Sequence, residues 1–204
     1  MGRIEAEAVR MGGLVDSLLT LARLDESKEL AFAETDLVPI ALEAAKDASV
    51  AEHKRKIVVL NLQDEKIPAD YQAKAMVDAM AFRQVLTNLL ANASRFSPAD
   101  KNVELAIGHE GHKTIIEVRD HGEGIPKQLR EKVFERFFRV DKSGARSEGG
   151  SGLGLSIVKH ILDSHNQTIS VRSTIGVGST FTFSLDKFEG TSSTLVTSRG
   201  ITIK

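Results

Sequence analysis

The apolar residues of this chain follow two different periods in turn, and that alternation constrains the fold more than any other feature. Residues 36–56 and 79–94 carry apolar side chains at three- and four-residue steps, which predicts amphipathic helices. Residues 102–122 alternate apolar and polar side chains around a glycine-containing turn, which predicts a β-hairpin. The same patterns predict further strands at 56–63, 76–77, 168–174 and 179–186, and further helices at 125–138 and 152–164.

Strands interspersed with helices, but joined as hairpins rather than by regular crossovers, indicate the fold class. We expect an α/β (α+β) two-layer sandwich in which helices cover one face of a mixed, mostly antiparallel sheet. The domain is predicted to span residues 29–188. Residues 189–204 are rich in Ser, Thr and Gly, which is typical of a flexible tail or of an added edge strand, and we favour the tail.

Residues 4–24 form a separate amphipathic pattern, followed by a polar break at 25–29. This pattern predicts a helix that packs on the domain or belongs to a helix bundle, within a leader of residues 1–28. A lone amphipathic helix exposes its apolar stripe, so we expect either a weak homodimer through residues 4–24 or packing of the helix back onto the domain.

Composition excludes several classes of function. The net charge is −1 with both signs mixed along the chain, so we expect no nucleic-acid partner. There is no cysteine, which excludes disulfides, thiolate metal sites and cysteine nucleophiles. No apolar run approaches the roughly 18 residues of a membrane span, so we expect a soluble, cytoplasmic fragment.

Two asparagines lie on one line of the helix predicted at 79–94. Asn88 and Asn92 are four residues apart, and Arg95 and Phe96 continue that face a turn later. Asparagine is a poor interior helix residue because its amide competes with the backbone. Either the two amides are hydrogen-bonded to neighbouring loops, or their oxygens serve a Mg²⁺ ion, which needs few protein ligands when phosphates and water supply the rest.

Asp120 and two spaced glycines follow the second strand of the predicted hairpin. Gly122 and Gly124 allow backbone to approach a ligand closely. Taken alone, the segment is a routine Asp-and-Gly turn. In a purine site, the Asp120 carboxylate would accept a hydrogen bond from an exocyclic amine and select adenine over guanine.

The segment Gly149 to His160 has four glycines in its first six residues and runs directly into the helix predicted at 152–164. It matches neither the P-loop nor the dinucleotide-binding pattern. The run is either a flexible turn or a backbone cradle for phosphate, because N–H groups near Gly150, Gly152 and Gly154 open a helix whose dipole attracts anions.

These elements, in this order, resemble the ATP-binding catalytic domain of the sensor histidine kinases of two-component signalling. The resemblance runs from about residue 36 to residue 188. The segment 88–97 resembles the N box of the family, "DHGEGIP" its first glycine box, "FERFFRVD" its phenylalanine box and "GGSGLGLSIVKH" its second glycine box. The leader "RMGGLVDSLLTLARLD" is similar to the second helix of the dimerisation and histidine-phosphotransfer domain.

The resemblance implies ATP and Mg²⁺ as ligands and phosphoryl transfer as the activity. Asn88 and Asn92 match the magnesium-binding asparagines, and Asp120 matches the adenine-recognising aspartate. Arg95, Arg136 and Arg139 match basic residues near the phosphates, so that Asn92 and the three arginines form the implied catalytic set. The implied nucleotide site comprises Asn88, Asn92, Arg95, Phe96, Asp120, Gly122, Gly124, Ile125, Gly150, Ser151, Gly152, Leu153, Gly154 and Leu155.

The family's phosphoacceptor is a histidine followed by Glu or Asp on the first bundle helix. Here only His109 precedes a Glu, and it falls in the predicted hairpin turn, where we expect a solvated loop histidine. We therefore expect that the acceptor lies outside this sequence and that the fragment does not phosphorylate itself. The implied partners are a histidine-bearing phosphotransfer helix and a response regulator, in an intact protein anchored in the cell membrane.

Two alternatives stay open at this point. The fold also serves gyrase, the large heat-shock chaperone and serine kinases that control sigma factors. The chain could also be a catalytically silent module for dimerisation or for docking a response regulator.

Overall fold

A five-stranded mixed sheet organises the domain in a computed structural model, with strand order β2-β4-β5-β7-β6. Strand β2 pairs with β4 in parallel, and the other neighbours are antiparallel, as predicted. The structure describes residues 30–51, 55–140 and 151–187, with Met11, Gly12, Val15 and Leu19. The strands are β2 (Ile57–Leu60), β4 (Val103–Glu110), β5 (Lys113–Asp120), β6 (Ile169–Thr174) and β7 (Gly178–Asp186).

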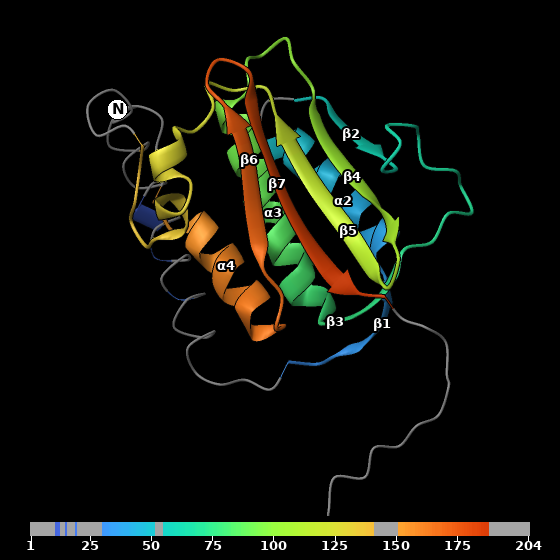
Figure 1. Cartoon of the computed structure of the whole chain (residues 1–204). Helices are drawn as coiled ribbons and strands as arrows, with labels where there is room; N and C mark the ends of the chain where they lie inside the picture. Colours follow the sequence, from blue (N-terminus) through green and yellow to red (C-terminus); the bar gives the residue numbers. More distant parts are fainter. Residues whose placement is uncertain are drawn as a thin grey trace, which may run out of the picture.

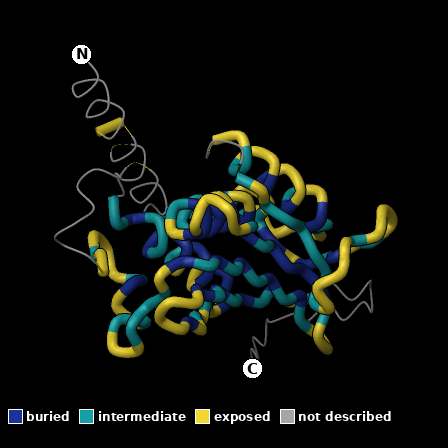
Figure 2. Tube along the Cα trace, turned by 90° about the horizontal axis from the view of Figure 1, so that it is seen from above, coloured by how far each residue is buried: buried dark blue, intermediate teal, exposed yellow. Residues whose placement is uncertain are grey.

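Three helices cover one face of this sheet (Figure 1). They are α2 (Leu37–Ala51), α3 (Ala79–Phe96) and α4 (Gly154–Ser164). Buried positions lie between the sheet and the helices, and exposed positions lie around them (Figure 2). The apolar face predicted for α3 is confirmed, since Val85, Leu86, Leu89, Leu90 and Ala93 are buried. The two-layer sandwich expected from the sequence is therefore correct.

A second, two-stranded sheet was not predicted. Strand β1 (Ala33–Asp36) pairs antiparallel with β3 (Lys74–Val77). The side chain of its last residue, Asp36, accepts from Val38 N at 3.2 Å at the start of α2. The same Oδ1 atom also accepts from Ala73 N at 3.1 Å, so Asp36 ties the start of α2 to the segment before β3.

The segment between β5 and α4 differs from the expectation of one helix at 125–138. It contains two short 3₁₀ helices, η1 (Lys127–Leu129) and η2 (Lys132–Phe134). Phe137 then adopts a left-handed backbone conformation, with φ of 64°, which no α-helix continues through. Of the apolar residues in this segment, Val133 is buried and Phe134 packs against the core.

The hairpin of β4 and β5 corrects the expectation for His109. The turn is made by residues 111 and 112, with Gly111 at a φ of 57°, and His109 lies within β4. Its ring nitrogen Nδ1 is 3.0 Å from the Thr114 hydroxyl, and burial lowers the pKa of His109. His109 is therefore a half-buried strand residue, not a solvated loop histidine.

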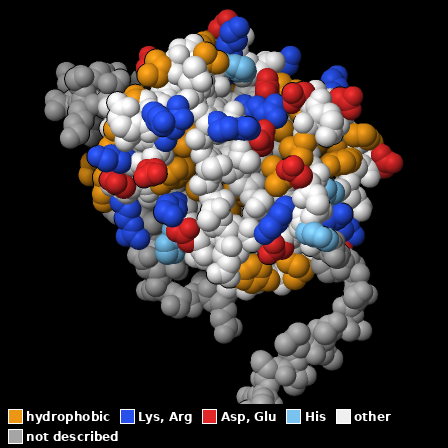
Figure 3. Space-filling view, viewed as in Figure 1, with side chains coloured by type: hydrophobic (Ala, Val, Ile, Leu, Met, Phe, Trp, Pro, Cys, Tyr) orange, Lys and Arg blue, Asp and Glu red, His pale blue; other side chains and the backbone are white. Residues whose placement is uncertain are grey.

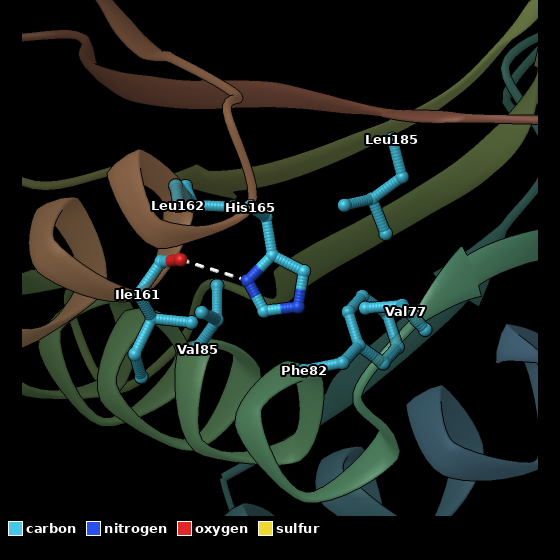
Figure 4. A pocket seen from close by; sticks show the side chains of 7 residues that line it. All are labelled: Val77, Phe82, Val85, Ile161, Leu162, His165 and Leu185. Carbon is cyan, nitrogen blue, oxygen red and sulfur yellow. Dashed lines mark hydrogen bonds between the residues drawn. The ribbon is translucent and has the colours of Figure 1, made fainter. Parts of the chain in front are cut away.

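His165 joins α4 to α3 at the end of the helix layer that is remote from the β6–β7 turn. Its Nδ1 donates to Ile161 O at 2.8 Å, and its Nε2 accepts from Asp78 N at 3.4 Å. The apolar side chains around the ring leave no space for a water molecule, so this is packed core (Figure 4). The surrounding residues are Val77, Phe82, Val85, Ile161, Leu162 and Leu185.

The other face of the sheet carries interleaved charges of both signs (Figure 3). Glu117 in β5 accepts from Arg119 Nη2 at 2.8 Å and from Arg172 Nη2 at 3.1 Å. Burial alone would lower the pKa of Arg119, but hydrogen bonds with Asp64 and Glu117 raise it. On this face, Glu117 and Arg119 are therefore the centre of a set of paired charges that also includes Asp64 and Arg172.

The leader and the tail lie largely outside the described residues. Within 4–24, the described residues Met11, Gly12, Val15 and Leu19 are helical and exposed, and 189–204 are not described. The weak homodimer and the flexible tail stay predictions. None of the helices that the structure describes is long and apolar enough to cross a membrane.

Candidate nucleotide site

Asp120 ends β5 on the side that faces the helices. Thr114, Ile116 and Val118 occupy the earlier inward positions of the same strand and are fully buried. Asp120 itself is 9% exposed. Its Oδ1 accepts from Gly122 N at 2.9 Å and from Ser179 N at 3.1 Å. Burial nevertheless raises the pKa of Asp120 above its ordinary value, because desolvation disfavours the carboxylate more than these donors favour it.

The glycines after Asp120 are required by close backbone contacts. A Cβ atom at Gly122 would lie 2.6 Å from Phe96 O at the end of α3. Gly124 has a φ of 76°, and a Cβ there would lie 2.3 Å from Thr174 O in the β6–β7 turn. The loop after β5 therefore lies between α3 and the end of β6, and neither Gly122 nor Gly124 has room for a side chain. Ile125 continues it, and its N–H donates to Ser173 Oγ at 2.7 Å.

Asn88 faces the first turn of α4. Its Nδ2 donates to Gln84 O at 3.1 Å, which directs Oδ1 away from that turn of α3. A Cβ atom at Gly154 would lie 3.4 Å from Asn88 Oδ1. The amide oxygen therefore lies beside the helix N-terminus. Asn92 is half-buried one turn later on α3.

The N-terminus of α4 is shaped by Ser151 to Gly154. Leu153 is fully buried, and its N–H donates to Ser151 Oγ at 3.3 Å. Gly152 has a φ of 71°, and its carbonyl accepts from Phe137 N at 2.9 Å. Leu155 packs against the core. The segment before α4 is thus held to the end of the phenylalanine-box segment.

The remaining predicted residues lie at the end of α3 and on either side of the segment that precedes α4. Arg95 is half-buried near the end of α3, and the Phe96 side chain is 62% exposed. Arg136 and Arg139 are exposed in the segment after η2. Gly150 lies outside the described residues.

Three motifs that are far apart in the sequence therefore meet on α3. The Phe96 carbonyl oxygen lies against Gly122 of the first glycine segment, and the Asn88 side chain lies beside Gly154 of the second. Figure 1 shows the end of β5 and the β6–β7 turn at the same end of the sheet. The loop after Asp120 and the N-terminus of α4 thus both lie against α3.

Sequence reasoning missed two serines beside Asp120. Ser173 in β6 and Ser179 in β7 are buried, and their hydroxyl oxygens are 3.0 Å apart. Neither serine was predicted to belong to the site. The available signal was a polar pair at inward positions of strands whose other inward residues are apolar.

Residues 77–189 match the family described as "Histidine kinase-, DNA gyrase B-, and HSP90-like ATPase". The chain belongs to this ATPase family. Sensor-like histidine kinase SenX3 of Mycolicibacterium smegmatis is 35% identical over 189 residues, which are 91% of this chain and 47% of that relative. The chain thus spans about half the length of this ATPase relative, which carries the name of a sensor histidine kinase.

Solved structures of the ATPase family agree with the observed fold. The crystal structure of full-length ShkA in complex with AMPPNP has a TM-score of 0.71 and 25% identity, and covers 92% of this chain and 40% of that one. Mycobacterial sensor histidine kinase MprB has a TM-score of 0.64 and 23% identity, and covers 77% of this chain and 98% of that one. The predicted resemblance to sensor histidine kinases is confirmed.

Proposed function

We propose that this domain binds ATP with Mg²⁺ and donates the γ-phosphate to a histidine in two-component signalling. The observation that carries the proposal is the meeting of three motifs on α3. The Phe96 carbonyl backs Gly122, and Asn88 faces Gly154. These contacts support a proposal in which Asp120 accepts from adenine and the N-terminus of α4 attracts the phosphates.

Asp120 is the residue that recognises the base in this proposal. A carboxylate accepts from the exocyclic amine of adenine, whereas guanine presents an oxygen at that position. Both backbone donors contact Oδ1. We therefore assign the amine of adenine to Oδ2. Gly122, Gly124 and Ile125 form the wall beside the base, and Phe96 lies at its edge.

The phosphates are assigned to the N-terminus of α4. The helix is 11 residues long, so its first N–H groups and its dipole attract an anion. Gly150, Ser151, Gly152, Leu153, Gly154 and Leu155 supply this backbone. Arg95, Arg136 and Arg139 are proposed to neutralise charge on the phosphates, as phosphoryl transfer requires.

The donor set near the phosphates fits Mg²⁺. Asn88 presents a neutral amide oxygen beside Gly154, with its nitrogen held by Gln84 O. Among the described residues, no three His, Asp or Glu side chains cluster as metal ligands. Asn88 and Asn92 would hold the ion together with phosphate oxygens and water, and the ion would neutralise phosphate charge.

The phosphoacceptor is proposed to lie outside this chain. His109, which precedes a Glu, is half-buried in β4 and bonded to Thr114. We propose that a histidine on a phosphotransfer helix of the intact protein accepts the phosphate and passes it to a response regulator. The intact protein is proposed to be anchored in the cell membrane and to pair weakly through residues 4–24.

Calorimetric titration with ATP, with and without Mg²⁺, tests the nucleotide site. We expect Asn92→Ala and Asn88→Ala to lose the increase in affinity that Mg²⁺ produces. Thr87→Ala, an exposed position on the same helix, is the matched control and should keep it. Equal effects of Mg²⁺ in all four proteins would contradict the metal assignment. Acid-labile phosphohistidine within this chain after incubation with labelled ATP would contradict the external acceptor.

A further inference from the structure

The inward face of β6 and β7 carries a polar pair where an apolar ladder would be expected to continue. Directly opposed residues are Ile169 with Phe183 and Val171 with Phe181. The third pair on this face is Ser173 with Ser179. Both serines are buried, with 9% and 5% of their surface exposed. Buried hydroxyl groups cost free energy unless they are hydrogen-bonded, so the hydrogen-bond partners of this pair show what it does.

Ser173 contacts three separate segments. Its Oγ accepts from Ile125 N at 2.7 Å and lies 3.0 Å from both Gly178 O and Ser179 Oγ. Its own carbonyl accepts from Arg130 Nη2, and Arg130 Nε donates to Ile125 O at 3.4 Å. One side chain thus joins the loop after β5 to the start of β7.

The two hydroxyl hydrogens can be arranged in two main ways. In the first, Ser173 donates to Gly178 O, and Ser179 donates to Ser173 or to Asp120. In the second, Ser173 donates to Ser179 and thereby holds its oxygen, while the Ser179 hydroxyl donates to Asp120. Burial raises the pKa of Asp120, while hydrogen bonds from the backbone and the Ser179 side chain lower it. The second arrangement therefore supports the ionised carboxylate that accepts from a base.

We infer that Ser173 is a positioning residue for adenine recognition, which holds Ser179 and the loop after Asp120 so that the carboxylate stays directed at the base. The inference rests on the proposed function and adds a residue to it. Ser173 acts through Ser179 and Ile125 rather than by touching the nucleotide. Among the described residues, His121 is the titratable group that also acts on the Asp120 charge.

Binding of ATP and of inosine triphosphate separates positioning from a general loss of structure. Inosine triphosphate has an oxygen in place of the exocyclic amine, so it does not report the Asp120 contact. We expect Ser173→Ala to lower ATP affinity about tenfold, because buried partners lose their hydrogen bonds. The affinity of Ser173→Ala for inosine triphosphate should change by less than about twofold. A structural defect alone would weaken both nucleotides equally.

Ser170→Ala is the matched control, since Ser170 lies on the same strand but is exposed, with its Oγ 3.4 Å from Thr182 O. It should leave both affinities unchanged. Ser173→Thr keeps the hydroxyl and should restore the preference for ATP. Ser179→Ala should reproduce the loss, and the double variant should lose no more than either single one.

The outcomes distinguish the two proposals. An unaltered domain that prefers ATP, together with a Ser173→Ala variant that keeps this preference, overturns the inference alone. An unaltered domain that binds both nucleotides equally overturns the role of Asp120 and the inference with it. Additive losses in the double variant also overturn the inference, because they place the two serines in independent roles.

Discussion

Asp78, directly after β3, and Asp120, at the end of β5, lie at opposite ends of α3 and differ in their hydrogen-bond donors. Asp78 follows β3 and caps the start of α3, where Oδ1 accepts from Met80 N at 2.9 Å and from Ala81 N at 3.0 Å. Its Oδ2 accepts from Ala31 N at 3.0 Å. Burial alone would raise the pKa of Asp78, but these hydrogen bonds lower it. Asp78 is thus an anion whose two oxygens both have backbone donors.

Asp120 lies beside the other end of α3 and has the opposite balance. Its two backbone donors both reach Oδ1, and burial raises its pKa. A buried carboxylate that its own protein stabilises incompletely is one that a bound ligand can stabilise further. The placement of the backbone donors thus distinguishes Asp78, a structural residue, from Asp120, a proposed recognition residue.

The largest expected effect is the loss of ATP binding in Asp120→Asn. The amide keeps an oxygen for Gly122 N and Ser179 N but removes the charge that accepts from the adenine amine. A hydrogen bond to a charged group contributes about 1.5–3 kcal/mol, which corresponds to a loss of affinity on the order of 10- to 100-fold. Calorimetric titration measures it. Asp78→Asn, which changes the same group at the structural position, should bind ATP as the unaltered domain does.

Asp78→Ala should lower stability and largely preserve ATP affinity, in contrast to Asp120→Asn. It removes the N-cap of α3 and the acceptor for Ala31 N, so the free energy of unfolding should fall by about 1–2 kcal/mol. Urea unfolding measures this change. ATP affinity at a temperature where the variant is folded should stay within about twofold of the unaltered domain. A loss of affinity as large as in Asp120→Asn would remove the distinction between the two aspartates.

The pH dependence of stability should also differ between the two residues. A raised folded-state pKa means that Asp120 favours the fold below its unfolded pKa, near about 3.9, and that this contribution is lost as pH rises through the folded value. The stability advantage of Asp120→Asn should therefore grow as pH rises from about 4. Asp78 has a lowered pKa, so its contribution is present at neutral pH and is lost as pH falls. Thermal unfolding of Asp120→Asn and Asp78→Asn, each compared with the unaltered domain at several pH values, tests whether the two stability differences change with pH in opposite directions.

The smallest effect is expected at Ser94. Its hydroxyl, in α3, is the buried side-chain polar atom for which the described residues offer no hydrogen-bond partner. Ser94→Ala should raise the free energy of unfolding by about 1 kcal/mol, because an unsatisfied group is removed. ATP affinity should not change. A loss of binding in this variant would indicate that Ser94 belongs to the site after all.

The periodic parts of the fold could be predicted because one residue pattern decides them. The buried face of α3 and the hairpin of β4 and β5 follow from apolar spacing alone. Strand β1 could not be predicted, because its four residues pair with β3 about forty positions away and carry no clear alternation. Two short 3₁₀ helices replace the helix predicted at 125–138, and the left-handed Phe137 that follows them donates its N–H to Gly152 O, a residue from a later segment.

Some residues of the candidate site could likewise be predicted from the sequence, and others could not. Asn88, Asp120 and the glycines were predicted as site residues from their residue types and order. Ser173 and Ser179 were not, because their importance depends on the strand register that places them opposite each other beside Asp120. The role of His165 likewise depends on tertiary contacts, because its ring bonds to Ile161 O in α4 and to Asp78 N before α3.

Thermal unfolding of the unaltered domain and of Asp120→Asn, each with and without ATP and Mg²⁺, tests the central claim most directly. The account predicts that Asp120→Asn unfolds at a higher temperature than the unaltered domain without ligand, and that ATP raises the unfolding temperature of the unaltered domain alone. A variant that is less stable than the unaltered domain, or that gains as much from ATP, would contradict the claim that the buried charge of Asp120 is kept for the nucleotide.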